Sequence, residues 1–255
     1  MSEPEYVRAL DRGLAVLQAF SARTPVLTVA EVAAATNLTR ATARRLLFTL
    51  EKLEFVSANG RGYSLTPKML ALGYAYLSSA GVGPIATPRV QALSAEIREA
   101  VTVGTLSGSE YVAVARAAQP DRILTAGLAV GTTRPAHASS IGKVLLAQKS
   151  PAELDEWFAA STRTRYTART ITDEALLRKE LAEVRERGWA TSDQELEEGL
   201  LSVGVPIHRG DRVVAAMNTT SHVGRTTLED MIRDVLPRLL VVSAAISDDL
   251  AHTMA

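Results

Sequence analysis

Arginine side chains gather in one short stretch near the start of the chain, where their spacing is chemically informative. Arg40, Arg44 and Arg45 fall between Thr36 and Leu50, an interval that contains no acidic residue. A guanidinium group presents a rigid fork of donors that matches phosphate oxygens and the major-groove edge of guanine. The cluster therefore predicts a contact with nucleic acid, although many arginine-rich helix faces are simply solvated.

Two short helices joined by a tight turn are predicted to position these arginines. Thr28 and Glu31 form a capping box at the start of the first helix, and Asn37 tolerates the left-handed backbone of a turn. Thr39 is a suitable N-cap for the second helix. The pattern predicts a helix-turn-helix whose second helix enters the major groove. The apolar positions that recur with helical spacing in this second helix are Leu46, Leu47, Leu50 and Leu53.

A hairpin is predicted directly after the second helix, because two strand-like runs flank Asn59-Gly60. A hairpin at this place makes the module a winged helix-turn-helix, with Arg61 at the wing tip near a phosphate or the minor groove. Small residues at Ala41 and Ala43 are expected to let the helix backbone approach another surface. The predicted DNA-binding residues are Thr39, Arg40, Ala41, Thr42, Arg44, Arg45 and Arg61.

The charge distribution supports a nucleic-acid partner although the whole chain is neutral. Residues 1–80 contain nine Lys/Arg and six Asp/Glu, a net charge of +3, whereas residues 81–255 contain 19 and 22, a net charge of −3. The absence of cysteine excludes disulfides and thiolate metal sites. No apolar run approaches the ~20 residues that span a bilayer, and no signal peptide is recognisable. We therefore expect a cytoplasmic protein without a membrane partner.

Three regions are predicted from the pattern along the chain: a winged module over 1–67, a linker helix and hinge over 68–83, and a second domain over 84–255. Residues 6–20 read as a first helix with an apolar stripe. An apolar helix over 68–79 carries Tyr74, Tyr76 and Leu77, which are expected to contact either the same chain or a second copy. The stripe of the first helix consists of Val7, Leu10, Leu14, Ala15 and Leu17.

The second domain is predicted to combine an antiparallel sheet with helices on its faces. Hairpins are expected at 101–106 with 111–117 and at 201–207 with 212–219, and a further strand at 123–128. The helices are expected at 85–100, 139–147, 151–160, 173–187 and 228–251.

An anion site is predicted near residues 134–143, where small and hydroxyl residues begin a helix after Arg134. The alternative is that Ser139 only caps this helix. Ser139 or Ser140, His137 and Asp193 also include the residue types of a hydrolytic triad. No G-x-S-x-G motif surrounds either serine, and the four histidines lack metal-ligand spacing. We therefore expect no catalytic residue, metal or cofactor; a winged helix that binds protein is the other alternative.

Several segments resemble the IclR family of transcription regulators. Residues 6–20, 39–47 and 63–67 resemble its DNA-binding module, and residues 135–147 and 195–207 resemble two effector-domain signatures. This resemblance implies a two-domain α/β protein: an N-terminal winged helix-turn-helix, a linker helix, and a C-terminal α+β, GAF-like effector domain. It also implies dimers, often paired into tetramers, and operator double-stranded DNA as a partner. Residues 39–45 and 72–79 are most similar to regulators of the protocatechuate/β-ketoadipate and 4-hydroxybenzoate pathways.

The resemblance also implies an effector pocket for a small carboxylic acid. Ser140 and Ile141 match pocket positions of the first signature, and Asp193, Leu200 and Ser202 match those of the second. Arg134 departs from the apolar residue of members that sense small keto acids, and its charge favours an aromatic acid or a dicarboxylate. The leading candidates are β-ketoadipate and protocatechuate. Asp193 favours a hydroxylated ring if it accepts a hydrogen bond from a hydroxyl; the alternative is that Arg134 neutralises Asp193 directly. The alternative is a regulator of another small-carboxylate pathway.

Overall fold

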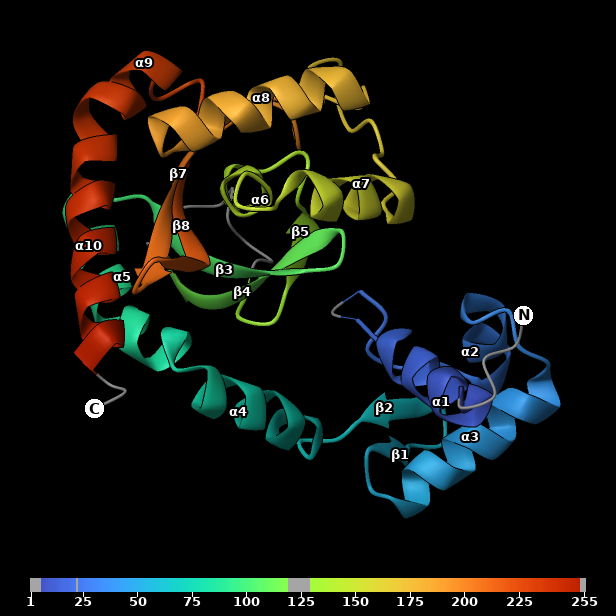
Figure 1. Cartoon of the computed structure of the whole chain (residues 1–255). Helices are drawn as coiled ribbons and strands as arrows, with labels where there is room; N and C mark the ends of the chain where they lie inside the picture. The colour runs from blue at the N-terminus through green and yellow to red at the C-terminus, as the bar shows by residue number, and fades with distance from the viewer. Residues whose placement is uncertain (1–5, 22, 119–128, 253–255) are drawn as a thin grey trace. The chain divides into compact units, whose positions relative to one another are not determined.

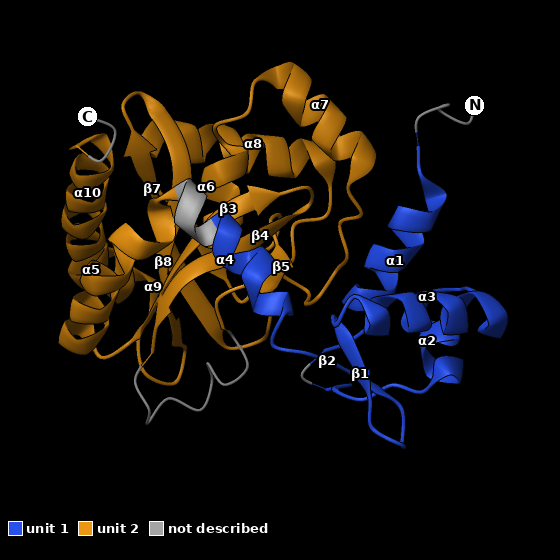
Figure 2. Ribbon diagram, turned by 90° about the horizontal axis from the view of Figure 1, so that it is seen from below, with its two compact units in different colours: residues 1–76 blue, residues 77–255 orange. Residues whose placement is uncertain are grey.

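The computed structural model describes residues 6–21, 23–118 and 129–252, without the side chains of 77–80. The chain divides into two compact units, residues 1–76 and 77–255, which Figure 2 shows in different colours. The predicted strand over 123–128 and the side chain of Leu77 lie outside the described part. None of the helices described is long and apolar enough to span a membrane.

Unit 1 contains the predicted helix-turn-helix. Helix α1 spans Arg8–Gln18, α2 spans Val29–Ala35 and α3 spans Arg40–Lys52. Thr28 and Glu31 form the expected capping box, and the side chain of Thr39 accepts a hydrogen bond from the backbone N–H of Thr42. Asn37, with φ of 52°, takes the left-handed conformation in the turn between α2 and α3. Local capping and turn chemistry thus set the boundaries of both helices.

The buried face of α1 differs from the predicted stripe. Leu10 and Leu14 are 63% and 49% exposed, whereas Val16 is fully buried. Only the last turn of α1 reaches the core of unit 1, so Leu10 and Leu14 in its first two turns are left exposed by the residues of the unit that the structure describes. That core contains Val16, Leu17, Phe20, Leu27, Val32, Ala33, Ala43, Leu47, Leu50 and Val56.

The predicted wing is present as a short antiparallel hairpin. Strand β1 (Val56–Ala58) pairs with β2 (Tyr63–Leu65). The side chain of Asn59 accepts hydrogen bonds from the backbone N–H groups of Arg61 and Gly62, which closes the turn. Helix α4 (Met69–Ala80) follows and ends at Gly81, whose φ is 70°. Only Gly81 separates α4 from the next helix, because that helix already begins at Val82.

Unit 2 is built on an antiparallel sheet of six strands in the order β5-β4-β3-β8-β7-β6. Its long hairpins are the two predicted ones, extended by a few residues. The two short strands were not predicted, because three or four residues give too weak a pattern. The strands are β3 (Ala100–Ser107), β4 (Glu110–Ala117), β5 (Thr133–Pro135), β6 (Ala190–Asp193), β7 (Leu200–Arg209) and β8 (Arg212–His222).

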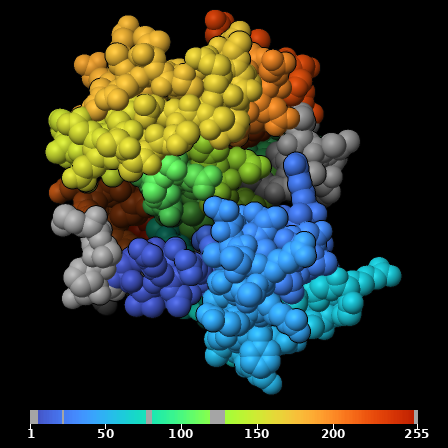
Figure 3. Space-filling model, turned by 90° about the vertical axis from the view of Figure 1, so that its right-hand side faces the viewer, coloured from blue at the N-terminus to red at the C-terminus, as the bar shows by residue number. Residues whose placement is uncertain are grey.

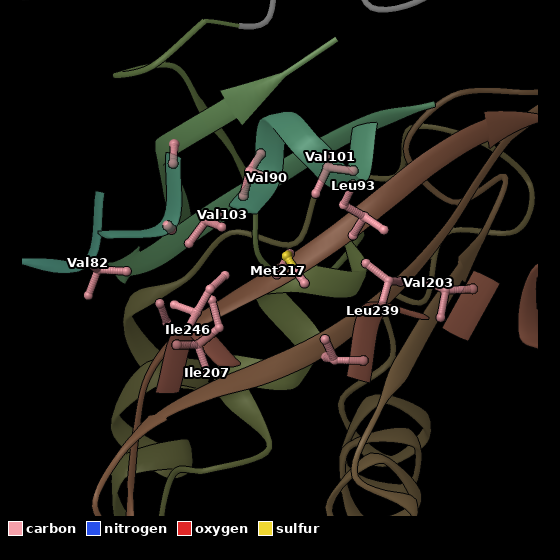
Figure 4. Packing of buried hydrophobic residues seen from close by; sticks show 14 of the residues in the cluster. Val82, Val90, Leu93, Val101, Val103, Val203, Ile207, Met217, Leu239 and Ile246 are labelled. Carbon is pink, nitrogen blue, oxygen red and sulfur yellow. The ribbon is translucent and has the colours of Figure 1, made fainter. Parts of the chain in front are cut away.

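Helices α5 (Val82–Ile97) and α10 (Leu236–His252) cover one face of this sheet (Figure 1). A π-helical turn over Met231–Val235 joins α10 to the short α9 (Leu228–Asp230) just before Pro237, a residue that cannot donate a helical hydrogen bond. Figure 4 shows how the inward side chains interdigitate beneath α5 and α10. The labelled residues are Val82, Val90, Leu93, Val101, Val103, Val203, Ile207, Met217, Leu239 and Ile246.

The opposite face of the sheet is covered by α6 (Ser140–Leu146), beyond which α7 (Pro151–Ala160) and α8 (Glu174–Arg187) pack. Side chains alternate across a strand, so the residues between the apolar ones face α6. On β7 and β8 these alternate residues include Ser202 and Asn218, beside the apolar Val203 and Met217. The face toward α6 is therefore polar near its centre, and this polarity locates the site described below.

Candidate DNA-binding surface and effector cavity

The three arginines of α3 are available for an external partner. Arg40, Arg44 and Arg45 are exposed, and their guanidinium groups make no ion pair with any residue in the described ranges. Arg40 and Arg44 are one helical turn apart and share a face. Figure 3 shows the surface of this module, drawn in light blue, in the space-filling view. The positive charge of these arginines is not neutralised by an ion pair with any described residue of unit 1.

The other predicted DNA-binding residues differ in their surroundings. Arg61 and Ala41 are exposed. Thr39 donates a hydrogen bond from its hydroxyl to that of Thr42 at 3.0 Å while it caps α3. Ala43 is fully buried in the core of unit 1, so the expectation that it faces another surface is wrong; its small size instead serves the packing of α3.

A small cavity lies in unit 2 on the sheet face toward α6, and its volume is about 80 Å³. One buried water needs about 10–15 Å³ of such space, so the cavity suits a small ring or a short dicarboxylic acid. Its lining residues are Thr102, Tyr111, Arg116, Arg134, Ala138, Ser139, Ser192, Leu196, Glu197, Leu200, Ser202, Asn218 and Thr220.

The strand register brings the polar residues of this wall together. Thr102 of β3 lies opposite both Arg116 of β4 and Asn218 of β8. In the next row, Ser202 of β7 lies opposite both Thr220 and Ser192. The two rows lie side by side on the sheet and together cross β4, β3, β8, β7 and β6. They bring together residues that are more than 100 positions apart in the sequence.

Two guanidinium groups give the cavity a positive character. Arg116 donates a hydrogen bond to the hydroxyl of Thr102 at 3.2 Å, and Arg134 donates one to the carbonyl of Thr133 at 3.0 Å. Burial lowers the pKa of Arg116, but a guanidinium group is not deprotonated in proteins, so this side chain keeps its positive charge. Burial also raises the pKa of Tyr111, so this phenol stays neutral. The cavity can therefore neutralise a carboxylate.

The hydroxyl groups around the start of α6 are already connected. Ser139 caps α6 by accepting a hydrogen bond from the N–H of Gly142, as the structural alternative proposed. Ser140 is fully buried, and its hydroxyl lies 2.8 Å from that of Ser202 and accepts a hydrogen bond from Asn218 at 3.1 Å. Ser140 thus stands behind two residues that line the cavity.

The predicted effector residues fall into two groups. Arg134, Leu200 and Ser202 line the cavity, and Ser140 is bonded to its wall. Ile141 packs into the apolar core beneath α6, and Asp193 forms an ion pair with Arg169. Neither of these last two lines the cavity, because β6 and the first turn of α6 turn their side chains elsewhere.

The residue types of a hydrolytic triad are separated in the structure. The ring of His137 is hydrogen-bonded to the carbonyl oxygen of Thr164 at 3.0 Å, and Asp193 pairs with Arg169. Ser139 and Ser140 bond to Gly142, Ser202 and Asn218 as described above. Across the described ranges, no group of three or more His, Asp or Glu is placed to hold a metal ion.

The cavity contains residues that sequence reasoning missed, notably Tyr111, Arg116 and Asn218. A charged residue at the end of the apolar run Tyr111–Ala117 was a usable signal, because a buried strand seldom carries an arginine without a polar partner. Asn218, which follows the apolar run 213–217, was a second signal. Their convergence depended on strand pairing that the sequence pattern did not specify.

Comparison with known proteins identifies the family. A model of the IclR helix-turn-helix domain matches residues 9–60, and a model of the bacterial transcriptional regulator IclR C-terminal domain matches residues 74–248. The chain is 40% identical over 253 residues to the Pca regulon regulatory protein of Pseudomonas putida, covering 99% of this chain and 86% of that protein.

Two further matches cover nearly the whole chain. The p-hydroxybenzoate hydroxylase transcriptional activator of Acinetobacter baylyi is 34% identical over 240 residues, which cover 92% of this chain and 89% of that protein. A crystal structure from Rhodococcus sp. RHA1 superposes with a TM-score of 0.82 at 42% identity, covering 97% of this chain and 100% of that one.

The two matched regions contain the two sites described above. The helix-turn-helix match includes the arginines of α3, and the C-terminal match includes every residue that lines the cavity. The predicted family, the two-domain fold and a regulatory rather than enzymatic role are confirmed by these matches. The chain belongs to the IclR family of bacterial transcriptional regulators.

Proposed function

We propose that this regulator binds operator DNA through unit 1 and that a small carboxylic acid in the cavity of unit 2 alters this binding. The observation that carries the proposal is the pair of guanidinium groups, Arg116 and Arg134, in the wall of one small cavity. An arginine pairs with a carboxylate through two parallel hydrogen bonds, and this pairing strengthens as water is excluded. The cavity thus favours an anion over a neutral ligand.

The proposed effectors are protocatechuate, 4-hydroxybenzoate and β-ketoadipate, and the proposed targets are genes of aromatic-acid catabolism. Two of the similar proteins are named for the Pca regulon and for p-hydroxybenzoate hydroxylase. A cavity of about 80 Å³ is compatible with acids of this size. The proposed contacts are Arg134, Leu200 and Ser202, with Ser140 behind them; Ile141 and Asp193, which do not line the cavity, stay predictions.

Calorimetric titration of the full chain with each acid tests the ligand proposal. We expect binding of at least one acid to the wild type and a loss of roughly tenfold or more for Arg134→Leu, because a charge-assisted hydrogen bond contributes about 1.5–3 kcal/mol. Arg238→Leu is a matched control, since Arg238 is exposed and pairs with Glu96 away from the cavity. Failure of all three acids to bind the wild type would contradict the proposal.

The DNA-binding proposal is tested against the alternative of a protein-binding winged helix. The proposed contacts are Thr39, Arg40, Ala41, Thr42, Arg44, Arg45 and Arg61. Neutralising phosphates releases counterions, so the logarithm of the affinity falls linearly with the logarithm of salt concentration. We expect a retarded band with DNA from upstream of the neighbouring genes and a steep salt dependence. A module that bound protein instead would show no such band.

The boundaries of the functional regions are part of the same proposal: DNA binding in 1–67, a linker helix and hinge in 68–83, and effector binding in 84–255. Self-association is proposed through α1 and α4, whose apolar side chains are exposed. Because its proposed partner is DNA, we place the regulator in the cytoplasm. The exposed side chains are Leu10 and Leu14 of α1, Tyr6 and Val7 just before it, and Leu70, Leu72, Tyr74 and Tyr76 of α4.

A further inference from the structure

We propose that Asn218 makes the cavity selective for anions that also carry a hydroxyl group, because its side-chain oxygen is an acceptor without a partner in the part of the chain that the structure describes. This inference rests on the proposed function, in which the cavity holds a carboxylic acid. The inference adds Asn218 as a residue that determines which of these acids binds most tightly. The ligand class that results is a hydroxylated aromatic monocarboxylate.

The oxygen of Asn218 is in an unusual state for a buried group. The residue lines the cavity and is only 5% exposed. Its Oδ1 atom is buried and has no hydrogen-bond partner among the residues the structure describes. Buried polar atoms are nearly always paired, so an orphaned acceptor in a cavity wall indicates that a ligand or a water supplies the donor.

The hydrogen bonds of Asn218 form a short chain with Ser140 and Ser202. The Nδ2 group of Asn218 donates to the hydroxyl of Ser140 at 3.1 Å, because an amide nitrogen can only donate. The hydroxyl of Ser140 lies 2.8 Å from that of Ser202, and either hydroxyl can be the donor. When Ser140 donates, the hydroxyl of Ser202 keeps its hydrogen for an acceptor in the cavity. The chain then ends in a donor at Ser202 and an acceptor at Asn218.

A hydroxylated acid matches both ends of this chain. Its carboxylate accepts hydrogen bonds from Ser202 and the two arginines of the wall, and its hydroxyl donates to Asn218. A second carboxylate could not donate to Asn218 and would be repelled by the amide oxygen. Selectivity of this kind is strong when a buried polar atom is left unpaired by the wrong ligand.

Two hydroxyl oxygens of the wall already accept hydrogen bonds, and the carboxylate of the wall is exposed. Ser139 accepts the N–H of Gly142, and Thr102 accepts a hydrogen bond from Arg116. Glu197 is exposed, and its charge would oppose an anionic ligand. The acceptor first expected for a ligand hydroxyl, Asp193, pairs with Arg169 outside the cavity. A neutral amide accepts the hydroxyl without repelling the carboxylate, which favours Asn218 for this role.

Calorimetric titration of the full chain with benzoate, 3-hydroxybenzoate and 4-hydroxybenzoate tests the inference. We expect the wild type to bind at least one hydroxybenzoate roughly tenfold more tightly than benzoate, as one hydrogen bond implies. In Asn218→Leu, which preserves size but removes the acceptor, this preference should shrink to about threefold or less. Thr220→Val is the control, because Thr220 lines the same cavity on the same strand, and it should keep the preference.

Three outcomes are decisive. A wild type without preference for either hydroxybenzoate overturns the inference, as does a preference that survives in Asn218→Leu; in both cases an acid still binds and the proposed function stands. Absence of binding by all three acids overturns the inference and counts against the proposed function as well. Asn218→Ala repeats the test if thermal unfolding shows that Asn218→Leu is not folded.

Discussion

Single residues give each site of this regulator its chemistry. The arginines of α3 are exposed and unpaired within the described chain, whereas the two arginines of the cavity lie among hydroxyl groups and a phenol. The same side chain is thus suited to DNA in one unit and to a small acid in the other. The two sets of arginines differ in how much protein surrounds them. In the cavity the surrounding protein excludes water, and this strengthens charge-assisted hydrogen bonds.

Loss of an α3 arginine should weaken operator binding in a sequence-dependent way. We expect Arg44→Ala or Arg45→Ala to cost about 1–3 kcal/mol if the residue pairs with guanine. Arg61→Ala should instead lower the affinity for all sequences and flatten the salt slope by about one unit, as a phosphate contact does. Gel-shift titration measures both effects, with the exposed Lys179→Ala on α8 as the control. Unchanged affinity after loss of both Arg44 and Arg45 would refute the groove assignment.

Acid should destabilise unit 2 through His137. Burial lowers the pKa of His137 below its ordinary value of about 6.5. The folded protein therefore binds a proton on His137 less tightly than the unfolded chain does. The contribution of neutral His137 to stability is fully present above the ordinary histidine pKa, and it is lost as the pH falls through the lower pKa of the folded state. The melting temperature should drop more between pH 7.5 and pH 5.5 in the wild type than in His137→Gln. An equal drop in both proteins would exclude this contribution.

Individual elements of unit 2 are held in place by close contacts that leave little room for larger side chains or for the loss of a charged partner. Helix α6 lies so close to the preceding segment that a Cβ atom at Gly142 would come within 2.2 Å of the backbone of Ala136. Lys143 on the same helix is 1% exposed and lies 2.5 Å from Glu195, in the loop that carries the cavity residues Leu196 and Glu197. A glycine and a buried ion pair thus connect α6 with the cavity wall.

Removal of one partner of this ion pair should destabilise the fold much more than replacement of both partners by apolar residues. We expect Lys143→Met to destabilise unit 2 by about 3–5 kcal/mol, because the carboxylate of Glu195 would remain buried without its cation. The double variant Lys143→Met/Glu195→Leu should recover part of this loss. Arg89→Met is the control; Arg89 pairs with Asp249 at an exposed site, where a loss of at most about 1 kcal/mol is expected. Denaturant unfolding distinguishes these cases, and equal effects of Lys143→Met and Arg89→Met would contradict the argument.

The whole molecule combines a small DNA-binding unit with a larger ligand-binding unit, and α4 crosses from one to the other in sequence. Unit 1 has large apolar side chains that are exposed and do not belong to its core. Leu70 and Tyr74 on α4 are 74% and 72% exposed, and Leu10 on α1 is 63% exposed. Leu70 and Tyr74 lie one helical turn apart on α4, and exposed apolar side chains gathered on one helix indicate a surface that another protein covers, which supports the proposed self-association.

Charges placed on α4 should break this association. Light scattering of Tyr74→Glu/Tyr76→Glu is expected to give a smaller particle mass than the wild type, because a carboxylate cannot be buried in an apolar contact without a large cost. Leu176→Glu on α8 provides a matched control, since Leu176 is also 61% exposed but lies in unit 2. A wild-type mass for the α4 variant would show that these residues do not form the subunit contact.

Sequence periodicity, capping and turn residues determined much of this protein. They predicted the helix-turn-helix, the wing, the two long hairpins and most helices of unit 2, because these elements depend on residues close together in the chain. The buried face of α1 and the short strands β5 and β6 were decided by packing, since few residues of each carry a pattern. The cavity depended most on tertiary structure. The register across β4, β3, β8, β7 and β6 brings Arg116, Ser202 and Asn218 together, whereas Asp193 pairs with Arg169 and Ile141 packs into the core beneath α6.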